Sequence, residues 1–111
     1  MAEIRRVDGV ATWLRAAQGA RPYVVFKHST TCPVSAAAER EFRMWAEGVG
    51  PDGPDLWAVT VPEQATLSRR IAADTGIAHR SPQVLYVRDG RVVWHASHGQ
   101  ITQASLRGAI G

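Results

Sequence analysis

The chain has 111 residues, of which 45% are hydrophobic and 21% charged, a composition typical of folded globular proteins that excludes extensive disorder. This length is typical of one compact core, so we expect residues 1–111 to form a single domain. The formal net charge is +3, but the basic residues form no cluster, so we predict no nucleic-acid binding.

A helix followed by a buried strand is predicted at the start of the chain. In "VDGVATWLRAAQGA" (7–20) apolar residues recur at the spacing of one helix face, at Val10, Trp13, Leu14 and Ala17. Asp8 is placed to cap this helix and Gly19 to end it. The β-rich run "YVVFK" (23–27) is almost continuously apolar, which indicates a strand covered on both faces.

A second helix and a second strand are predicted next. The segment "CPVSAAAEREFRMWAEG" (32–48) has an apolar helix face made of Val34, Ala38, Phe42 and Trp45, and Gly48 marks its end. After a loop rich in Gly and Pro, "LWAVTV" (56–61) predicts a buried strand. Pro62 suits the first turn of a third helix, whose apolar face contains Leu67 and Ile71.

The rest of the chain predicts a hairpin and a closing helix. The segments "QVLYVR" (83–88) and "RVVWHA" (91–96) are joined by Asp89-Gly90, a strong signal for a two-residue turn. Thr102 is placed to cap the last helix, with Ile101 and Leu106 packed across the cap. The predicted order αβαβαββα gives an α/β fold: a four-stranded mixed sheet with helices on both faces.

The chain contains one cysteine, Cys32, which excludes an internal disulfide. The sequence begins "MAEIRRVDGV", without an apolar stretch of signal-peptide length, and no later segment approaches a membrane span. We therefore predict a cytoplasmic protein that does not contact membranes and whose thiol is normally kept reduced.

Cys32 lies where the first predicted strand passes into a helix. This is the carboxyl end of a central strand, where active sites collect in open α/β sheets. If Cys32 is the N-cap and Pro33 the first helical residue, the N–H groups of Val34 and Ser35 can point at the sulfur and lower its pKa. A second interpretation stays open, in which Cys32 is an inert, small hydrophobic residue.

Other polar side chains near Cys32 also bear on this chemistry. Lys27 and His28 can add positive potential. Ser35, three residues after Cys32, can donate a hydrogen bond to a thiolate but cannot displace sulfur. His95 and His98 have H-x-x-H spacing, but one is predicted on a strand and the other in a loop, so we predict no metal site.

Two parts of the sequence resemble a known family. The segment "TGIAHRSPQVLYVRDGRVVWHASHGQITQASLRGAI" resembles the second half of a thioredoxin, with Ser81-Pro82 at the cis-proline, Asp89-Gly90 at the turn and Gly99 after the last strand. The pattern "FKHSTTCPVS" followed by "HRSPQ" is similar to the monothiol bacilliredoxin-like proteins of the bacillithiol system. This resemblance covers nearly the whole chain.

The resemblance implies a thioredoxin-like fold in which Cys32 is the nucleophile, Pro82 faces it and Ser81 is a thiol-binding position. The residues expected to support the thiolate are Lys27, His28, Thr31, Pro33, Val34 and Ser35. Bacillithiol carries carboxylates, and we name Arg80 and His79 as candidates for binding its malate portion.

The implied reaction is thiol–disulfide exchange with S-bacillithiolated client proteins as partners. Cys32 attacks the small-thiol sulfur of the mixed disulfide, the protein thiol leaves, and a second bacillithiol or another reductase regenerates Cys32. Bacillithiol is thus a co-substrate, no cofactor is tightly bound, and we expect a monomer.

The alternative functions are an iron–sulfur carrier, a peroxidase and a non-catalytic module. Monothiol glutaredoxins that handle iron–sulfur clusters resemble C-G-F-S, whereas Pro33 and Val34 follow the cysteine here. A peroxidase is not supported, because the Pro and Thr expected at fixed positions ahead of a peroxidatic cysteine are absent. The alternative from another class is a non-catalytic thioredoxin-like module that binds a partner, with Cys32 inert or only protected by S-thiolation.

Overall fold

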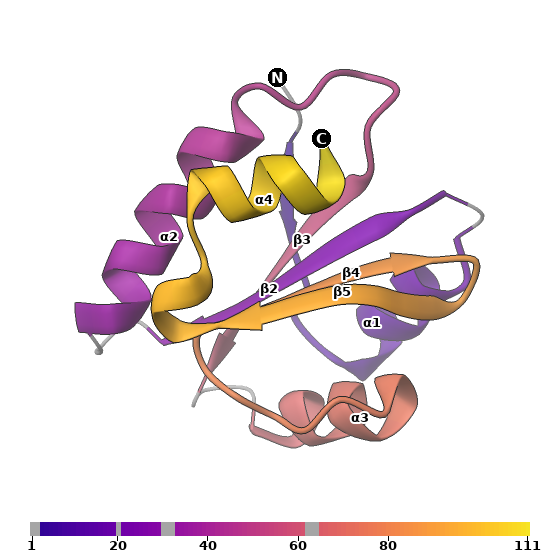
Figure 1. Cartoon of the computed structure of the whole chain (residues 1–111). Coiled ribbons are helices and arrows are strands. Elements are labelled where there is room, and N and C mark those ends of the chain that lie inside the picture. The colour runs from indigo at the N-terminus through magenta and orange to yellow at the C-terminus, as the bar shows by residue number, and fades with distance from the viewer. Residues whose placement is uncertain (1–2, 20, 30–32, 62–64) are drawn as a thin grey trace.

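The computed structural model describes residues 3–19, 21–29, 33–61 and 65–111 (Figure 1). Within these ranges the elements are β1 (Ile4–Arg6), α1 (Val10–Ala17), β2 (Tyr23–Ser29), α2 (Pro33–Ala46), β3 (Asp55–Val61), α3 (Ala65–Thr75), β4 (Gln83–Arg88), β5 (Arg91–Ser97), the 3₁₀ helix η1 (His98–Gln100) and α4 (Gln103–Ile110).

The strands form one mixed sheet of order β1-β3-β2-β4-β5. Strands β1 and β2 run parallel to β3, whereas β4 is antiparallel to β2 and β5 antiparallel to β4. The predicted four-stranded sheet and the order αβαβαββα are therefore wrong by one strand, β1. Its sequence, "IRR", has no apolar alternation, and it becomes a strand because it pairs with Leu56–Ala58 of β3.

Helices cover both faces of the sheet, as predicted (Figure 1). The side chains of α2 and α4 pack with Val24 and Phe26 of β2 in one apolar cluster. Those of α1 and α3 pack with Tyr23 and Val25 in another. Strand β2 thus lies in the middle of the sheet and is covered on both faces. Packing against these two apolar layers positions its carboxyl end.

Two predicted details at helix starts are wrong. The N-cap of α1 is Gly9, and the carboxylate of Asp8 instead accepts a hydrogen bond from the Thr12 hydroxyl at 2.7 Å. Val34 is 47% exposed, because the apolar face that it was predicted to share is buried only from Ala38, one turn further into α2. The buried face of α2 consists of Ser35, Ala38, Phe42, Trp45 and Ala46.

The predicted hairpin and the cap of the last helix are confirmed. Asp89 and Gly90 both have positive φ values, 53° and 76°, as a tight turn between β4 and β5 requires. The Thr102 hydroxyl accepts a hydrogen bond from the Ser105 N–H at 3.0 Å, and Ile101 and Leu106 are buried. None of the helices in the described ranges combines the length and apolar character that spanning a bilayer requires.

Candidate active site

The candidate site lies at the carboxyl end of β2, where the chain passes into α2. Strand β2 ends at Ser29 and α2 begins at Pro33, the predicted first helical residue. Ser35 is fully buried, and its hydroxyl oxygen accepts a hydrogen bond from the Ser29 N–H at 3.1 Å, which ties the strand end to the first helical turn. Thr31 and Cys32 lie outside the described residues, so their predicted roles remain predictions.

A loop that precedes β4 forms the other side of the site. The Ser81–Pro82 peptide bond is cis, and Pro82 is buried. Gln83, the next residue, pairs with Lys27 across the sheet, so the cis peptide lies beside the end of β2. The Pro82 carbonyl accepts a hydrogen bond from the His98 N–H at 3.0 Å, which joins this loop to η1.

Ser81 has an unmet hydrogen bond at this site. Its hydroxyl oxygen is buried and has no hydrogen-bond partner in the part of the chain that the structure describes. Buried hydroxyl groups in native proteins are normally paired. The orphaned hydroxyl stands at the position that the sequence pattern marks for thiol binding.

Lys27 and His28, both predicted to add positive potential near the thiol, lie on opposite faces of the sheet because successive strand side chains alternate. The His28 ring stacks on Phe26, with centroids 5.1 Å apart, and its Nδ1 lies 3.8 Å from a Glu39 carboxylate oxygen. Lys27 lies on the other face and is 0% exposed.

The Lys27 amino group contacts the loop before the cis-proline. Its Nζ lies 3.2 Å from Nδ1 of His79. Burial lowers the pKa of Lys27 to about 8. The pKa of His79 is also lowered, first by burial and then by the positive charge of Lys27. At neutral pH the pair is therefore a charged lysine beside a neutral imidazole.

Gln83 is a site residue to which the sequence pattern alone assigned no role. Its side chain is buried, with Nε2 donating to the Ala78 carbonyl at 3.1 Å and Oε1 accepting from the Arg80 N–H at 3.4 Å. These bonds brace the loop that carries His79 and Arg80. In the sequence, the feature that could have indicated its role is a polar residue at the start of an otherwise apolar strand.

Arg80 lies at the edge of an open hollow of about 490 Å³. The hollow is lined by Arg80, His95, Ser97, His98, Gly99 and Gln100, with no carboxylate among them. No acidic group forms an ion pair with Arg80 among the described residues. The guanidinium is thus available to bind an anion next to the cis-proline loop.

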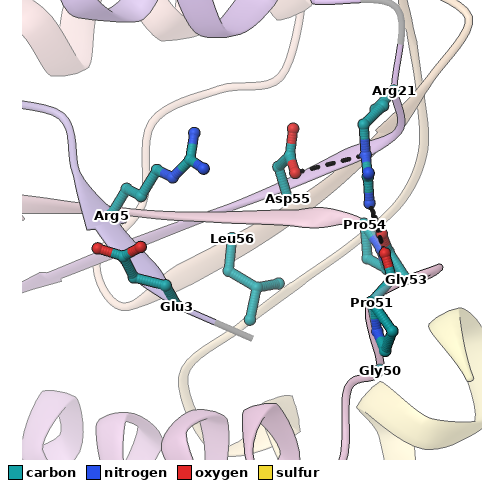
Figure 2. A pocket seen from close by; sticks show the side chains of 9 residues that line it. All are labelled: Glu3, Arg5, Arg21, Gly50, Pro51, Gly53, Pro54, Asp55 and Leu56. Carbon is teal, nitrogen blue, oxygen red and sulfur yellow. Dashed lines mark hydrogen bonds and ion pairs between the residues drawn. The ribbon is translucent and has the colours of Figure 1, made fainter. Parts of the chain in front are cut away.

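Figure 2 shows a second hollow, of about 210 Å³, where β2 and β3 begin. Here the Arg21 guanidinium donates to the carbonyls of Pro51 and Gly53 and pairs with Asp55 at 3.5 Å. These bonds hold a loop, and the hollow is at the amino ends of these parallel strands, whereas ligands of open α/β sheets bind at the carboxyl ends. Within the described ranges, His, Asp and Glu side chains form no group that could hold a metal ion.

Comparison with known proteins identifies the family. The family described as monothiol bacilliredoxin BrxC matches residues 3–106. The chain belongs to the monothiol bacilliredoxin family. A solved structure described as a candidate oxidoreductase with a thioredoxin fold is 31% identical to this bacilliredoxin-family chain. The match covers 96% of this chain and 92% of that chain, with a TM-score of 0.85.

Thioredoxins share the fold at lower identity. The thioredoxin of Fasciola hepatica is 16% identical over 95% of this chain and 94% of its own, with a TM-score of 0.74. That of Malassezia sympodialis is 13% identical over 98% and 89%, with a TM-score of 0.73. The bacilliredoxin family and the thioredoxin-like fold together support a thiol oxidoreductase role for this protein.

Proposed function

We propose that this bacilliredoxin-family protein is a monothiol thiol–disulfide oxidoreductase that removes bacillithiol from mixed disulfides on client proteins through Cys32. The family match over residues 3–106, which includes the only cysteine in the sequence, is the observation that carries the proposal. The position of the cis-proline loop beside the end of β2 supports it.

The reaction has two exchange steps. The Cys32 thiolate attacks the bacillithiol sulfur, a bond forms between the two sulfurs, and the old disulfide breaks with its electron pair on the client sulfur, which then takes a proton. Cys32 now carries the adduct. A second bacillithiol thiolate attacks the bacillithiol sulfur of that adduct, which releases oxidised bacillithiol and regenerates the Cys32 thiolate.

Three groups of the described site fit this substrate. The buried hydroxyl of Ser81 has a free hydrogen-bonding capacity that a bound thiol compound can satisfy. Pro82 forms the wall beside the end of β2. Arg80 and the hollow at its edge offer positive charge for the carboxylates of bacillithiol. Since Nδ1 of His79 already contacts Lys27, we assign carboxylate recognition to Arg80 rather than to His79.

The direct test uses a client protein carrying one bacillithiol adduct. We expect release of the client thiol with appearance of the adduct on Cys32 by mass spectrometry, and no release with Cys32→Ser. Turnover with a glutathione adduct but not with the bacillithiol adduct would refute the choice of small thiol. Accumulation of the Cys32 adduct without regeneration by bacillithiol would point to protective thiolation instead of reduction.

A non-catalytic partner-binding module would behave differently. Because Cys32 is the only cysteine, its alkylation by iodoacetamide can be followed without labelling of other thiols. The proposal requires Cys32 to be alkylated rapidly at pH values well below the ordinary thiol pKa of ~8.5. Reaction no faster than a free cysteine between about pH 5 and about pH 9 would favour the non-catalytic module. We further propose a cytoplasmic monomer, which the oligomeric state in solution would test in part.

A further inference from the structure

Lys27 is the only lysine in the sequence, and its side chain is fully buried. Lysine is almost never fully buried unless it is paired. In the part of the chain that the structure describes, no carboxylate lies within ion-pair distance of its Nζ. Asp74, an acidic residue of α3 on this face of the sheet, accepts hydrogen bonds from Trp13 and Arg70 instead.

The residues paired with Lys27 in the two neighbouring strands carry no charge. Its neighbours in the sheet are Val59 of β3 and Gln83 of β4, and the Gln83 amide is bonded to the loop before the cis-proline. Among the described residues, His79 is thus the hydrogen-bond partner of the buried ammonium group. An apolar residue would fill this position at lower cost, so the lysine requires an explanation beyond packing.

His79 connects this buried group to the surface. Because a lysine ammonium can only donate, Nδ1 of His79 accepts, and the proton of the neutral ring is on Nε2. His79 itself is an exposed residue, three positions before Pro82 in the loop that forms one side of the site. The Nε2–H is therefore the outer end of a two-residue hydrogen-bonded chain whose inner end is Lys27.

We propose that His79 and Lys27 form a proton relay that protonates the thiolate leaving from the client protein. The inference rests on the proposed function, because it assigns a donor to the proton of that reaction. When the client sulfur leaves with the electron pair of the disulfide bond, His79 gives it the Nε2 proton and Nδ1 takes a proton from Lys27. Lys27 becomes a neutral amine. A proton from water then enters at Nε2 while the Nδ1 proton returns to Lys27, which resets the pair.

The acid strengths suit this transfer. The pKa of Lys27 is lowered by burial to about 8, close to the ordinary thiol value of ~8.5, so the proton moves between groups of similar affinity. In this proposal His79, on the exposed loop before the cis-proline, is the group that donates to the leaving sulfur and so acts as the catalytic acid. Lys27 acts through His79 and is a positioning residue.

The test compares two bacillithiol mixed disulfides that differ in leaving group, one a cysteine peptide and the other an aromatic thiol. The aromatic thiolate is stable when it leaves and needs no proton, whereas the cysteine thiolate benefits from one. We expect His79→Gln to lower the transfer rate for the cysteine peptide about tenfold and to change the aromatic rate less than about twofold.

Lys27→Met should produce the same selective loss, and the double variant should lose no more than either single variant, because the two residues act as one unit. Arg91→Gln, which changes the exposed first residue of β5, is the matched control and should leave both rates unchanged. Since His79 lies on an exposed loop, His79→Gln tests the relay even if Lys27→Met fails to fold.

Equal losses with both leaving groups, no loss with either, or additive losses in the double variant would each overturn the relay. These outcomes leave the proposed function intact, because the aromatic substrate still reports attack by Cys32. If the wild-type protein transfers neither adduct, the proposed function is wrong and the relay falls with it.

Discussion

At the scale of single residues, positive charge at the site is divided between a buried ammonium group and an exposed guanidinium. Lys27 is 0% exposed and contacts His79, whereas Arg80, the next residue in the loop, faces the open hollow beside η1. Twelve of the thirteen Lys and Arg residues are arginine, and none of the arginines, all of which lie in the described ranges, is buried. The single lysine, Lys27, is the buried one. We assign proton transfer to the first group and anion binding to the second.

Arg80→Gln should weaken binding of the small thiol without slowing attack by Cys32. A lost charge-assisted hydrogen bond corresponds to about a tenfold rise in KM for the bacillithiol adduct, with kcat within about twofold. The comparison substrate is an uncharged adduct of 2-mercaptoethanol on the same client, whose KM should not change. An equal rise in KM for both adducts would show that Arg80 does not recognise carboxylates.

At the scale of elements, the loop before β4 is held in place from two sides. Gln83 of β4 bonds to Ala78 and Arg80 within the loop, and the N–H of His98 in η1 bonds to the Pro82 carbonyl. These contacts place His79, Arg80 and the cis peptide beside the end of β2. The loop is therefore positioned by its neighbours in the sheet and not by its own sequence.

Gln83→Leu should loosen this loop. The substitution removes the partners of the Ala78 carbonyl and the Arg80 N–H, with an expected cost of about 1–3 kcal/mol in the free energy of unfolding. It should also reduce transfer activity, since His79 and Arg80 lose their support. Urea unfolding and the transfer assay measure the two effects.

Thr102→Ala is the control for this change. It removes the N-cap of α4 and should lower stability by about 1 kcal/mol, but it lies outside the site and should leave activity unchanged. A loss of activity in Thr102→Ala equal to that of Gln83→Leu would mean that stability alone, and not the loop, governs the activity.

At the scale of the whole molecule, two apolar layers enclose the sheet, and Lys27 is buried where the sheet meets the α1–α3 layer. Burying a charge in this layer opposes folding. The pKa of Lys27 falls from 10.5 to about 8, so between these values the unfolded chain binds more protons than the folded one. Stability contributed by this group is therefore low at pH 7 and increases as pH rises above about 8.

Lys27→Met should remove the part of this increase that Lys27 contributes, leaving the part due to the Cys32 thiol, and should be more stable than the wild type at pH 7 by about 1 kcal/mol or more. Urea unfolding at pH ~7 and pH ~9, about one unit below the ordinary tyrosine pKa of ~10, measures both effects. With a single lysine in the chain, ¹³C-lysine labelling gives one side-chain NMR signal that reports its pKa directly. A midpoint near 10.5 would contradict the buried, desolvated ammonium.

The local sequence determined most of the elements and the family. The apolar periodicities, the Asp89-Gly90 turn, the Thr102 cap and the start of α2 at Pro33 are confirmed, because each depends on residues close together in the chain. The motif around Cys32, together with "SPQ", led to the monothiol bacilliredoxin family that the comparison shows.

Only the tertiary structure decided the features that depend on distant partners. Strand β1 exists because β3 pairs with it, and Val34 is exposed although Ser35, the next residue of the same helical turn, is fully buried. Lys27 and His79 are 52 positions apart in the sequence, so no local pattern could show that they touch. The short pattern around Cys32 thus indicated which thiol reacts, whereas the packing of the sheet decided which charges lie beneath the site.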